Sequence, residues 1–242
     1  MATFVLVHGA FRGGWSWGPV RERLQALGHD VRTPSLTGMG DRAHLRPLLS
    51  GVLHLQVWVD DVASLIRDAD LRDVALVGHS QAGLVIGPAA RAARDRVASI
   101  AYLDAPAPRP GERGVDIGPT GPPDDDLLPP ADTWIPPTPV SDGPAGGDRD
   151  LDAATASWMN DRLCATPLGP SLDPAPQNGA IQPAHFAFCA RTPPGFPAQL
   201  CRQRLDEKGS AYTVLEAGHD APITRPDLVV DWLQTIIEPV ER

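Results

Sequence analysis

Short apolar runs alternate with longer stretches of helical periodicity along the first hundred residues, and this alternation constrains the fold more than any other feature of the chain. The apolar runs predict buried strands at Phe4–Val7, Asp30–Thr33, Val74–Val77 and Val97–Leu103. Helical spacing of apolar residues between them predicts helices at Trp17–Leu27, Leu53–Ala69 and Gln81–Ala93. Because parallel strands need crossover connections, this order predicts an α/β fold with a mostly parallel sheet flanked by helices.

The C-terminal part of the chain repeats the pattern. Strands are expected at Phe186–Ala190 and Tyr212–Leu215, and helices at Pro197–Glu207 and Pro226–Ile237. A length of 242 residues suits one α/β domain. We therefore expect both ends of the chain to build the same sheet.

The middle of the chain has a different composition. Between Pro106 and Pro183 prolines and glycines are dense, which opposes regular structure, and we expect one helix there, at Leu151–Cys164. The segment is either a disordered linker or a lid over one edge of the sheet. Trp134 and Trp158 favour the lid, because disordered segments contain few aromatic residues. We accordingly predict a core formed by residues 1–105 and 184–242 and a lid insertion at 106–183.

The clearest chemical motif is Val77-Gly-His-Ser-Gln-Ala-Gly83, at the junction of a predicted strand and a predicted helix. A serine on such a tight turn is exposed above the sheet, at the positive end of the following helix. Ala82 stands where the G-x-S-x-G pattern has its second glycine, and a methyl group is a small departure. The motif predicts Ser80 as a nucleophile; the alternative is a serine that only caps a helix.

A serine hydroxyl needs a base to act as a nucleophile. His219 lies between the last predicted strand and the last predicted helix, which places it at the same sheet edge as Ser80. The alternative is a loop histidine that bonds only to backbone. His79 is expected to point away from the site and to be structural.

A nucleophilic serine also needs two backbone N–H groups to stabilise the oxyanion. We predict that Gln81 supplies one and that Ala10, in the loop after the first strand, supplies the other. Gly13 and Gly14 form no phosphate-binding motif. Phe11 and Trp134 are candidates for an apolar substrate pocket.

The acid of the expected triad departs from its usual position. This acid usually follows the strand that comes before the histidine's strand, but here the corresponding stretch, Cys189–Gly195, contains no carboxylate. Asp104, at the end of the strand after the serine motif, is the best candidate, since an acid is needed to orient the histidine. Two alternatives stay open: Asp104 is a structural residue bonded to the first turn of the lid, or no acid exists and hydrolysis is feeble.

Several segments together resemble the methylesterase and hydroxynitrile lyase branch of the α/β-hydrolases and its bacterial esterase-like members. They are His8–Trp15, Leu36–Arg42, Gly78–Ser80, Tyr102–Ala105 and Gly218-His219. The resemblance implies an α/β-hydrolase fold, a Ser-His-acid mechanism without a cofactor and a small helical lid. The lyase members carry a lysine directly after the catalytic histidine. Here that residue is Asp220, which favours hydrolysis.

Composition and charge argue against several classes of binding partner. The net charge of −9 makes a nucleic-acid partner improbable, and no apolar run approaches the length of a membrane span. The three cysteines lack metal-ligand spacing and are typical of reduced thiols, and no signal peptide precedes the first strand. We expect a cytoplasmic enzyme without metal or cofactor that acts on a small molecule; the sequence does not indicate its oligomeric state.

The predicted function is hydrolysis of a small, largely apolar carboxyl ester, lactone or thioester through an acyl-enzyme. The alternative is a repurposed hydrolase-fold protein that cyclises, rearranges or binds a metabolite without hydrolysing it.

Overall fold

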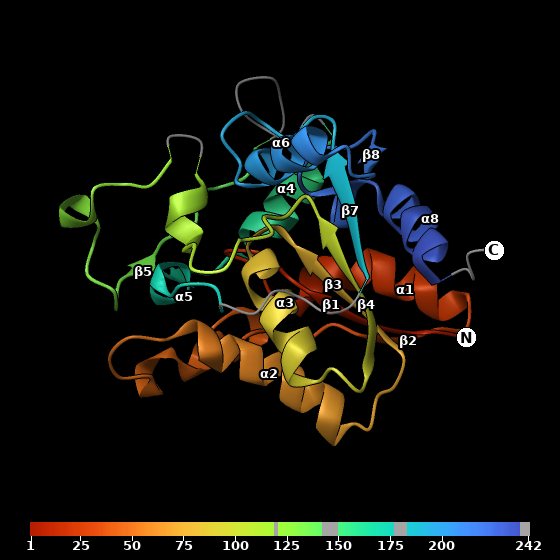
Figure 1. Cartoon of the computed structure of the whole chain (residues 1–242), viewed down its shortest axis with the longest axis horizontal. Helices are drawn as coiled ribbons and strands as arrows, with labels where there is room; N and C mark the ends of the chain where they lie inside the picture. Colours follow the sequence, from red (N-terminus) through yellow and green to blue (C-terminus); the bar gives the residue numbers. More distant parts are fainter. Residues whose placement is uncertain (119–120, 142–149, 177–182, 238–242) are drawn as a thin grey trace.

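Six parallel strands form one sheet at the centre of the computed structural model, which describes residues 1–118, 121–141, 150–176 and 183–237 (Figure 1). The strands follow the order β2-β1-β3-β4-β7-β8. Their bounds are β1 Thr3–Val7, β2 Asp30–Arg32, β3 Val74–His79, β4 Val97–Leu103, β7 Ala184–Cys189 and β8 Thr213–Leu215. The predicted α/β fold with strands from both ends of the chain is therefore confirmed. Strand β3 runs two residues beyond its predicted end, to the residue before Ser80.

Alternating residues of the strands pack into two apolar layers, as the two-residue period of a strand requires. Phe4 and Leu6 of β1 belong to the layer under α1 (Gly18–Ala26) and α8 (Pro226–Ile237). Val5 and Val7 belong to the opposite layer, under α2 (Leu55–Asp68) and α3 (Gly83–Ala92), to which α6 (Ala198–Lys208) also contributes. Helices thus cover both faces of the sheet, which explains why its strands are almost continuously apolar.

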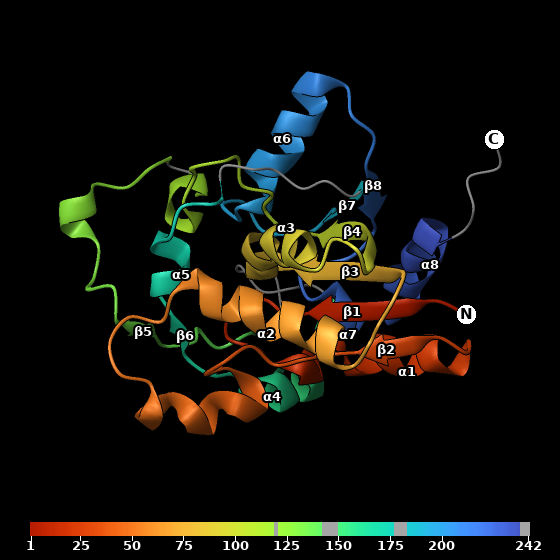
Figure 2. The same ribbon diagram turned by 60° about the horizontal axis from the view of Figure 1, so that its bottom comes forward.

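The segment between β4 and β7 contains short elements. In Figure 2 its green and teal parts lie mostly beyond the carboxyl ends of the strands. The elements are η4 Gly114–Ile117, η5 Asp125–Leu127, β5 Trp134–Ile135, α4 Ala153–Asn160, β6 Thr166–Pro167 and α5 Gly169–Leu172. Strands β5 and β6 form a separate antiparallel pair. Helix α4 begins two residues later than predicted because Asp152 caps it, accepting a hydrogen bond from the Thr155 N–H, and it ends four residues earlier, at Asn160.

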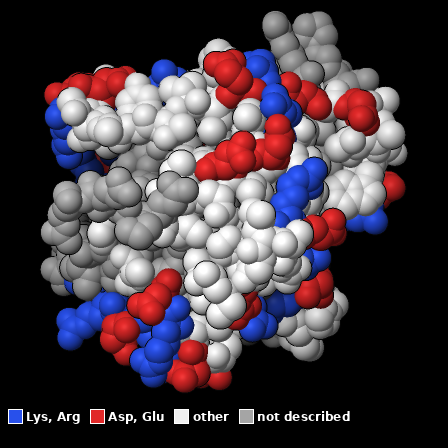
Figure 3. Space-filling model, turned by 90° about the vertical axis from the view of Figure 1, so that its right-hand side faces the viewer, with Lys and Arg blue, Asp and Glu red and all other residues white. Residues whose placement is uncertain are grey.

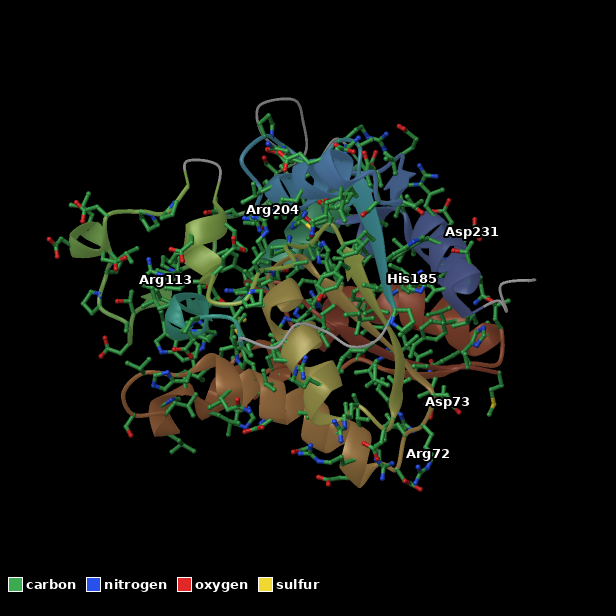
Figure 4. The ribbon with its side chains drawn as sticks, in the orientation of Figure 1. Arg72, Asp73, Arg113, His185, Arg204 and Asp231 are labelled. Atoms are coloured by element: carbon green, nitrogen blue, oxygen red, sulfur yellow. The ribbon has the colours of Figure 1, made fainter. Side chains whose placement is uncertain are left out.

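Two ion pairs join this segment to the rest of the molecule. Arg204 of α6, labelled in Figure 4, contacts Glu112 at 2.6 Å. Arg191 contacts Asp150 at 2.6 Å, and the same carboxylate accepts a hydrogen bond from the Gly218 N–H. The described parts of the segment are therefore docked on the core. Residues 142–149 and 177–182 of the predicted lid lie outside the described residues.

Four further short helices complete the described elements: η1 Gly14–Trp17, η2 Gly40–Leu48, η3 Ser80–Ala82 and α7 Ala221–Thr224. The sequence analysis did not predict η2, a 3₁₀ helix that contains Pro47, a residue that usually opposes a helix interior. Among the described helices, none combines the length and the apolar character needed to cross a bilayer. On the face that Figure 3 shows, acidic and basic side chains lie interspersed.

Candidate active site

Ser80 lies on a strained turn directly after β3. Its φ of 53° falls in the left-handed region, which non-glycine residues seldom occupy and which costs about 1–3 kcal/mol. Gly78 permits the tight packing of the turn, because a Cβ there would lie 2.9 Å from Ile86 of α3. The strand–turn–helix context predicted for the motif is present, and it exposes the serine side chain to a cavity.

Three side chains meet at the carboxyl ends of β3, β4 and β8. The His219 Nε2 lies 3.0 Å from the Ser80 Oγ, and the His219 Nδ1 lies 2.6 Å from the Asp104 Oδ2. A carboxylate can only accept, so the proton of neutral His219 is on Nδ1, and Nε2 is left to accept the hydroxyl proton of Ser80. This order of donors and acceptors allows His219 to act as a base toward Ser80.

Asp104 is almost completely buried, with 3% of its surface exposed. Its carboxylate accepts hydrogen bonds from His219, from the Thr192 hydroxyl and from the Cys189 N–H. Burial would raise the pKa of Asp104, but the hydrogen bond and charge of His219, together with the Thr192 hydroxyl, hold that pKa below its ordinary value. Within the described residues, these bonds lead to β7 and His219 rather than to the first turn after Pro106.

His79 is fully buried behind His219. Its Nε2 donates to the His219 backbone carbonyl at 2.8 Å, so it positions the base without facing the cavity. Burial, and then the nearby charges of His219 and Arg12, lower the pKa of His79 to about 3. The structure thus places His79 where a structural role was predicted for it.

The loop after β1 approaches Ser80 closely. A Cβ on Gly9 would lie 2.7 Å from the Ser80 Cβ, so this position admits no side chain without movement. His8 donates from Nδ1 to the Gly9 carbonyl at 2.8 Å and accepts from the Leu36 N–H at 3.0 Å. In a trans peptide the N–H points opposite to the C=O, so the Ala10 N–H is directed away from His8. Ala10 and Gln81 both line the cavity beside Ser80.

A buried ion pair, which sequence reasoning missed, connects this loop to the histidine loop. The Arg12 Nη2 lies 2.5 Å from the Asp220 Oδ1, and the Arg12 Nη1 donates to the Ala10 carbonyl at 3.1 Å. Burial would raise the pKa of Asp220, but the charges of Arg12, His219 and His79 and the Arg12 hydrogen bond together lower it below its ordinary value. No spacing signal could have indicated the pair, because its members are 208 positions apart.

The serine opens into a cavity of about 480 Å³. Among the described lining residues Arg12 is the only lysine or arginine, and it is already paired with Asp220. The wall is otherwise largely apolar and includes Phe11, Leu84, Pro106, Ile117, Val140, Leu151, Phe196 and Pro197. The ring of Phe196 lies 4.4 Å from that of His219, centroid to centroid.

The two residues predicted to line the pocket have different positions. Phe11 does line the cavity. The prediction for Trp134 is wrong, because this residue is not among those that line the cavity. The Trp134 ring lies against the backbone of Gly38, where a Cβ would be 2.5 Å away, and the Arg46 guanidinium stacks over it at 5.0 Å. Its place in the β5–β6 pair holds it against the loop that carries Gly38.

Comparison with known proteins gives one family and several relatives. A sequence model of the alpha/beta hydrolase family matches residues 4–232. A carbendazim hydrolyzing esterase from Nocardioides sp. (strain SG-4G) is 44% identical over 113 residues, which cover 46% of this chain and 45% of that protein. Salicylic acid-binding protein 2 from Nicotiana tabacum is 35% identical over 106 residues, or 42% of this chain and 38% of that protein. The chain thus matches less than half the length of these curated relatives.

Solved structures share the fold at lower identity. An extracellular alpha/beta-hydrolase from a Paenibacillus species superposes with a TM-score of 0.71 at 21% identity, covering 96% of this chain and 98% of that one. An Arabidopsis methylesterase superposes with a TM-score of 0.74 at 19% identity, covering 98% and 99%.

Proposed function

Because this chain belongs to the alpha/beta hydrolase family, we propose that it is a serine hydrolase that cleaves a small, largely apolar carboxyl ester, lactone or thioester. The observation that carries the proposal is the unbroken hydrogen-bonded series Ser80–His219–Asp104 facing an apolar cavity. In this series Ser80 is the nucleophile, His219 the general base and Asp104 the acid that orients His219.

In the acylation step, the His219 Nε2 takes the hydroxyl proton as the Ser80 Oγ attacks the ester carbonyl. The N–H groups of Ala10 and Gln81 donate to the oxyanion that forms. His219 then gives its proton to the leaving alcohol, and the acyl group stays on Ser80. Water, deprotonated by His219, attacks the acyl-enzyme, and the acid product leaves as Ser80 recovers its proton.

The cavity wall supports a neutral, apolar substrate. A carboxylate or phosphate on the substrate would meet no unpaired arginine or lysine among the described lining residues, since Asp220 already neutralises Arg12. Burying such a charge without a partner is unfavourable. The names of the relatives, a carbendazim hydrolyzing esterase and a pyrethroid hydrolase, agree with ester cleavage in a site of this kind.

The insertion between β4 and β7 is proposed to act as a lid. Its residues Ile117, Val140 and Leu151 form part of the cavity wall. The Gln81 side chain also joins the insertion to the core, since it donates to the Ser171 hydroxyl at 3.0 Å and accepts from the Thr166 hydroxyl at 3.2 Å. The position of the lid is thereby coupled to the residue that follows the nucleophile.

The test combines covalent labelling with turnover of a neutral p-nitrophenyl ester. A fluorophosphonate should label the wild-type protein at Ser80, and Ser80→Ala should lose labelling and at least about 10⁴-fold of kcat. Ser210→Ala, at an exposed serine after α6, is the matched control and should keep both. Persistent turnover in Ser80→Ala would refute the nucleophile. Tight ester binding without turnover in the wild type would favour the non-hydrolytic alternative.

A further inference from the structure

The segment after β7 holds the acid of the triad although it carries no carboxylate of its own. Strands β4 and β7 are neighbours in the sheet, so the residues that follow them come together at the same edge. Asp104 follows β4, and Thr192 follows β7. The Thr192 hydroxyl donates to the Asp104 Oδ2, which is the oxygen that also accepts the His219 Nδ1–H.

The second carboxylate oxygen is held by the same segment. The Asp104 Oδ1 accepts from the Cys189 N–H at 3.3 Å, and the Asp104 N–H donates to the Ala187 carbonyl at 2.7 Å. The segment is itself attached to the strand and loop that carry His219. The Ala190 N–H donates to Leu215, and the Arg191 N–H donates to Ala217. Thr192 is therefore held in a fixed relation to both the acid and the base.

We propose that Thr192 is a positioning residue for the catalytic acid Asp104. This inference rests on the proposed function. It assigns to the residues after β7 the hydrogen-bond donor that holds the carboxylate supplied by the residues after β4.

The positioning role follows from the hydrogen bonds of a buried carboxylate. Burial disfavours the charged form of Asp104, and each donor to its oxygens favours that form. Without the Thr192 hydroxyl, the Oδ2 keeps only the His219 donor, and the carboxylate is restrained only by this bond and by the 3.3 Å bond from the Cys189 N–H to Oδ1. A misoriented acid leaves His219 in the wrong tautomer for part of the time, which lowers kcat more than it raises KM.

The first experiment compares Thr192→Val with Thr192→Ser in the full chain. Thr192→Val is expected to lower kcat roughly 10-fold with little change in KM, in line with the loss of a hydrogen bond to a charged group. It should also move the acid limb of the pH–kcat profile to higher pH, because a carboxylate that has lost a donor accepts more strongly from the protonated imidazole of His219. Thr192→Ser keeps the hydroxyl and should recover the loss. Unchanged kcat and an unchanged profile in Thr192→Val would overturn the positioning role.

The second experiment removes the carboxylate. Asp104→Asn is expected to lose about 10⁴-fold in kcat, the loss seen for a serine protease with that change. Because the Thr192 hydroxyl acts through the Asp104 carboxylate, adding Thr192→Val to Asp104→Asn should cost little further. A further loss of about 10-fold in the double variant would overturn the positioning role.

A spectroscopic readout separates this inference from the proposed function. The proton on the His219 Nδ1 should give a far-downfield NMR signal in the wild type. This signal should shift in Thr192→Val and return to its wild-type position in Thr192→Ser. An inactive, unlabelled wild type would overturn the proposed function and this inference with it. An active wild type whose Thr192 variants behave otherwise would overturn this inference alone.

Discussion

The buried pair Arg12–Asp220 should contribute to stability only as a pair. The two side chains are 10% and 6% exposed, so Asp220→Ala leaves a guanidinium buried without its carboxylate. Removing one partner of a buried pair costs about 3–5 kcal/mol. In a protein of this size each 1 kcal/mol shifts Tm by about 2–4 °C, so Tm should fall by roughly 6–20 °C.

Replacing both partners should be far less harmful. Arg12→Met/Asp220→Leu fills similar space without burying a charge, and such replacements are often neutral or stabilising. The double variant should therefore recover most of the lost stability. It should still lose activity, because the Ala10 carbonyl no longer accepts a hydrogen bond from Arg12 and the loop that supplies the Ala10 N–H is less restrained.

The measurement is urea unfolding of the wild type, Arg12→Met, Asp220→Leu and Arg12→Met/Asp220→Leu, analysed as a double-mutant cycle, with Asp220→Ala measured alongside. The exposed pair Arg225–Asp227 serves as a control, since its side chains are 37% and 55% exposed and Asp227→Ala should cost less than about 1 kcal/mol. The reasoning is refuted if the free energy of unfolding of a single variant lies within about 1 kcal/mol of the wild-type value. It is also refuted if the double variant loses as much free energy of unfolding as the two single variants lose in sum.

Two further predictions concern the residues around the serine. Burial lowers the pKa of His8 to about 4 and that of His79 to about 3, so the unfolded chain binds protons that the folded chain does not. The free energy of unfolding should therefore fall as the pH drops below about 6.5, by roughly 2 kcal/mol per histidine at pH 5. Equal urea midpoints at pH 7.5 and pH 5 would contradict this prediction. Gly9→Ala would place a Cβ 2.7 Å from that of Ser80, so fluorophosphonate labelling should slow at least about 10-fold, whereas Gly18→Ala, where no atom lies within 4 Å, should label normally.

The position of Ser80 on its turn could be predicted from sequence because it depends on local structure. The apolar run before Ser80, the small residues around it and the helical spacing after it each act over a few neighbouring residues. The same holds for His219, whose place between the last strand and the last helix determines the sheet edge where it lies. The cytoplasmic location and the boundaries of the lid stay predictions.

The substrate wall could be predicted only in part. Phe11 is two residues from Gly9, so its place beside the serine follows from the loop that carries both. Trp134 lies in a proline-rich segment without a periodic pattern. An aromatic residue there is equally consistent with lining a pocket and with packing against another segment. The path of that segment sets the ring against Gly38 instead.

The sequence by itself determined the order of strands and helices, the serine on its turn and a short list of acids. Only the tertiary structure decided that Asp104 contacts the His219 ring, that the Thr192 hydroxyl donates to Asp104 and that Arg12 pairs with Asp220. These contacts join residues 115, 88 and 208 positions apart. Local periodicity indicates which face of an element is buried. Long-range side-chain contacts depend instead on which strands become neighbours, and this is determined only when the whole sheet packs.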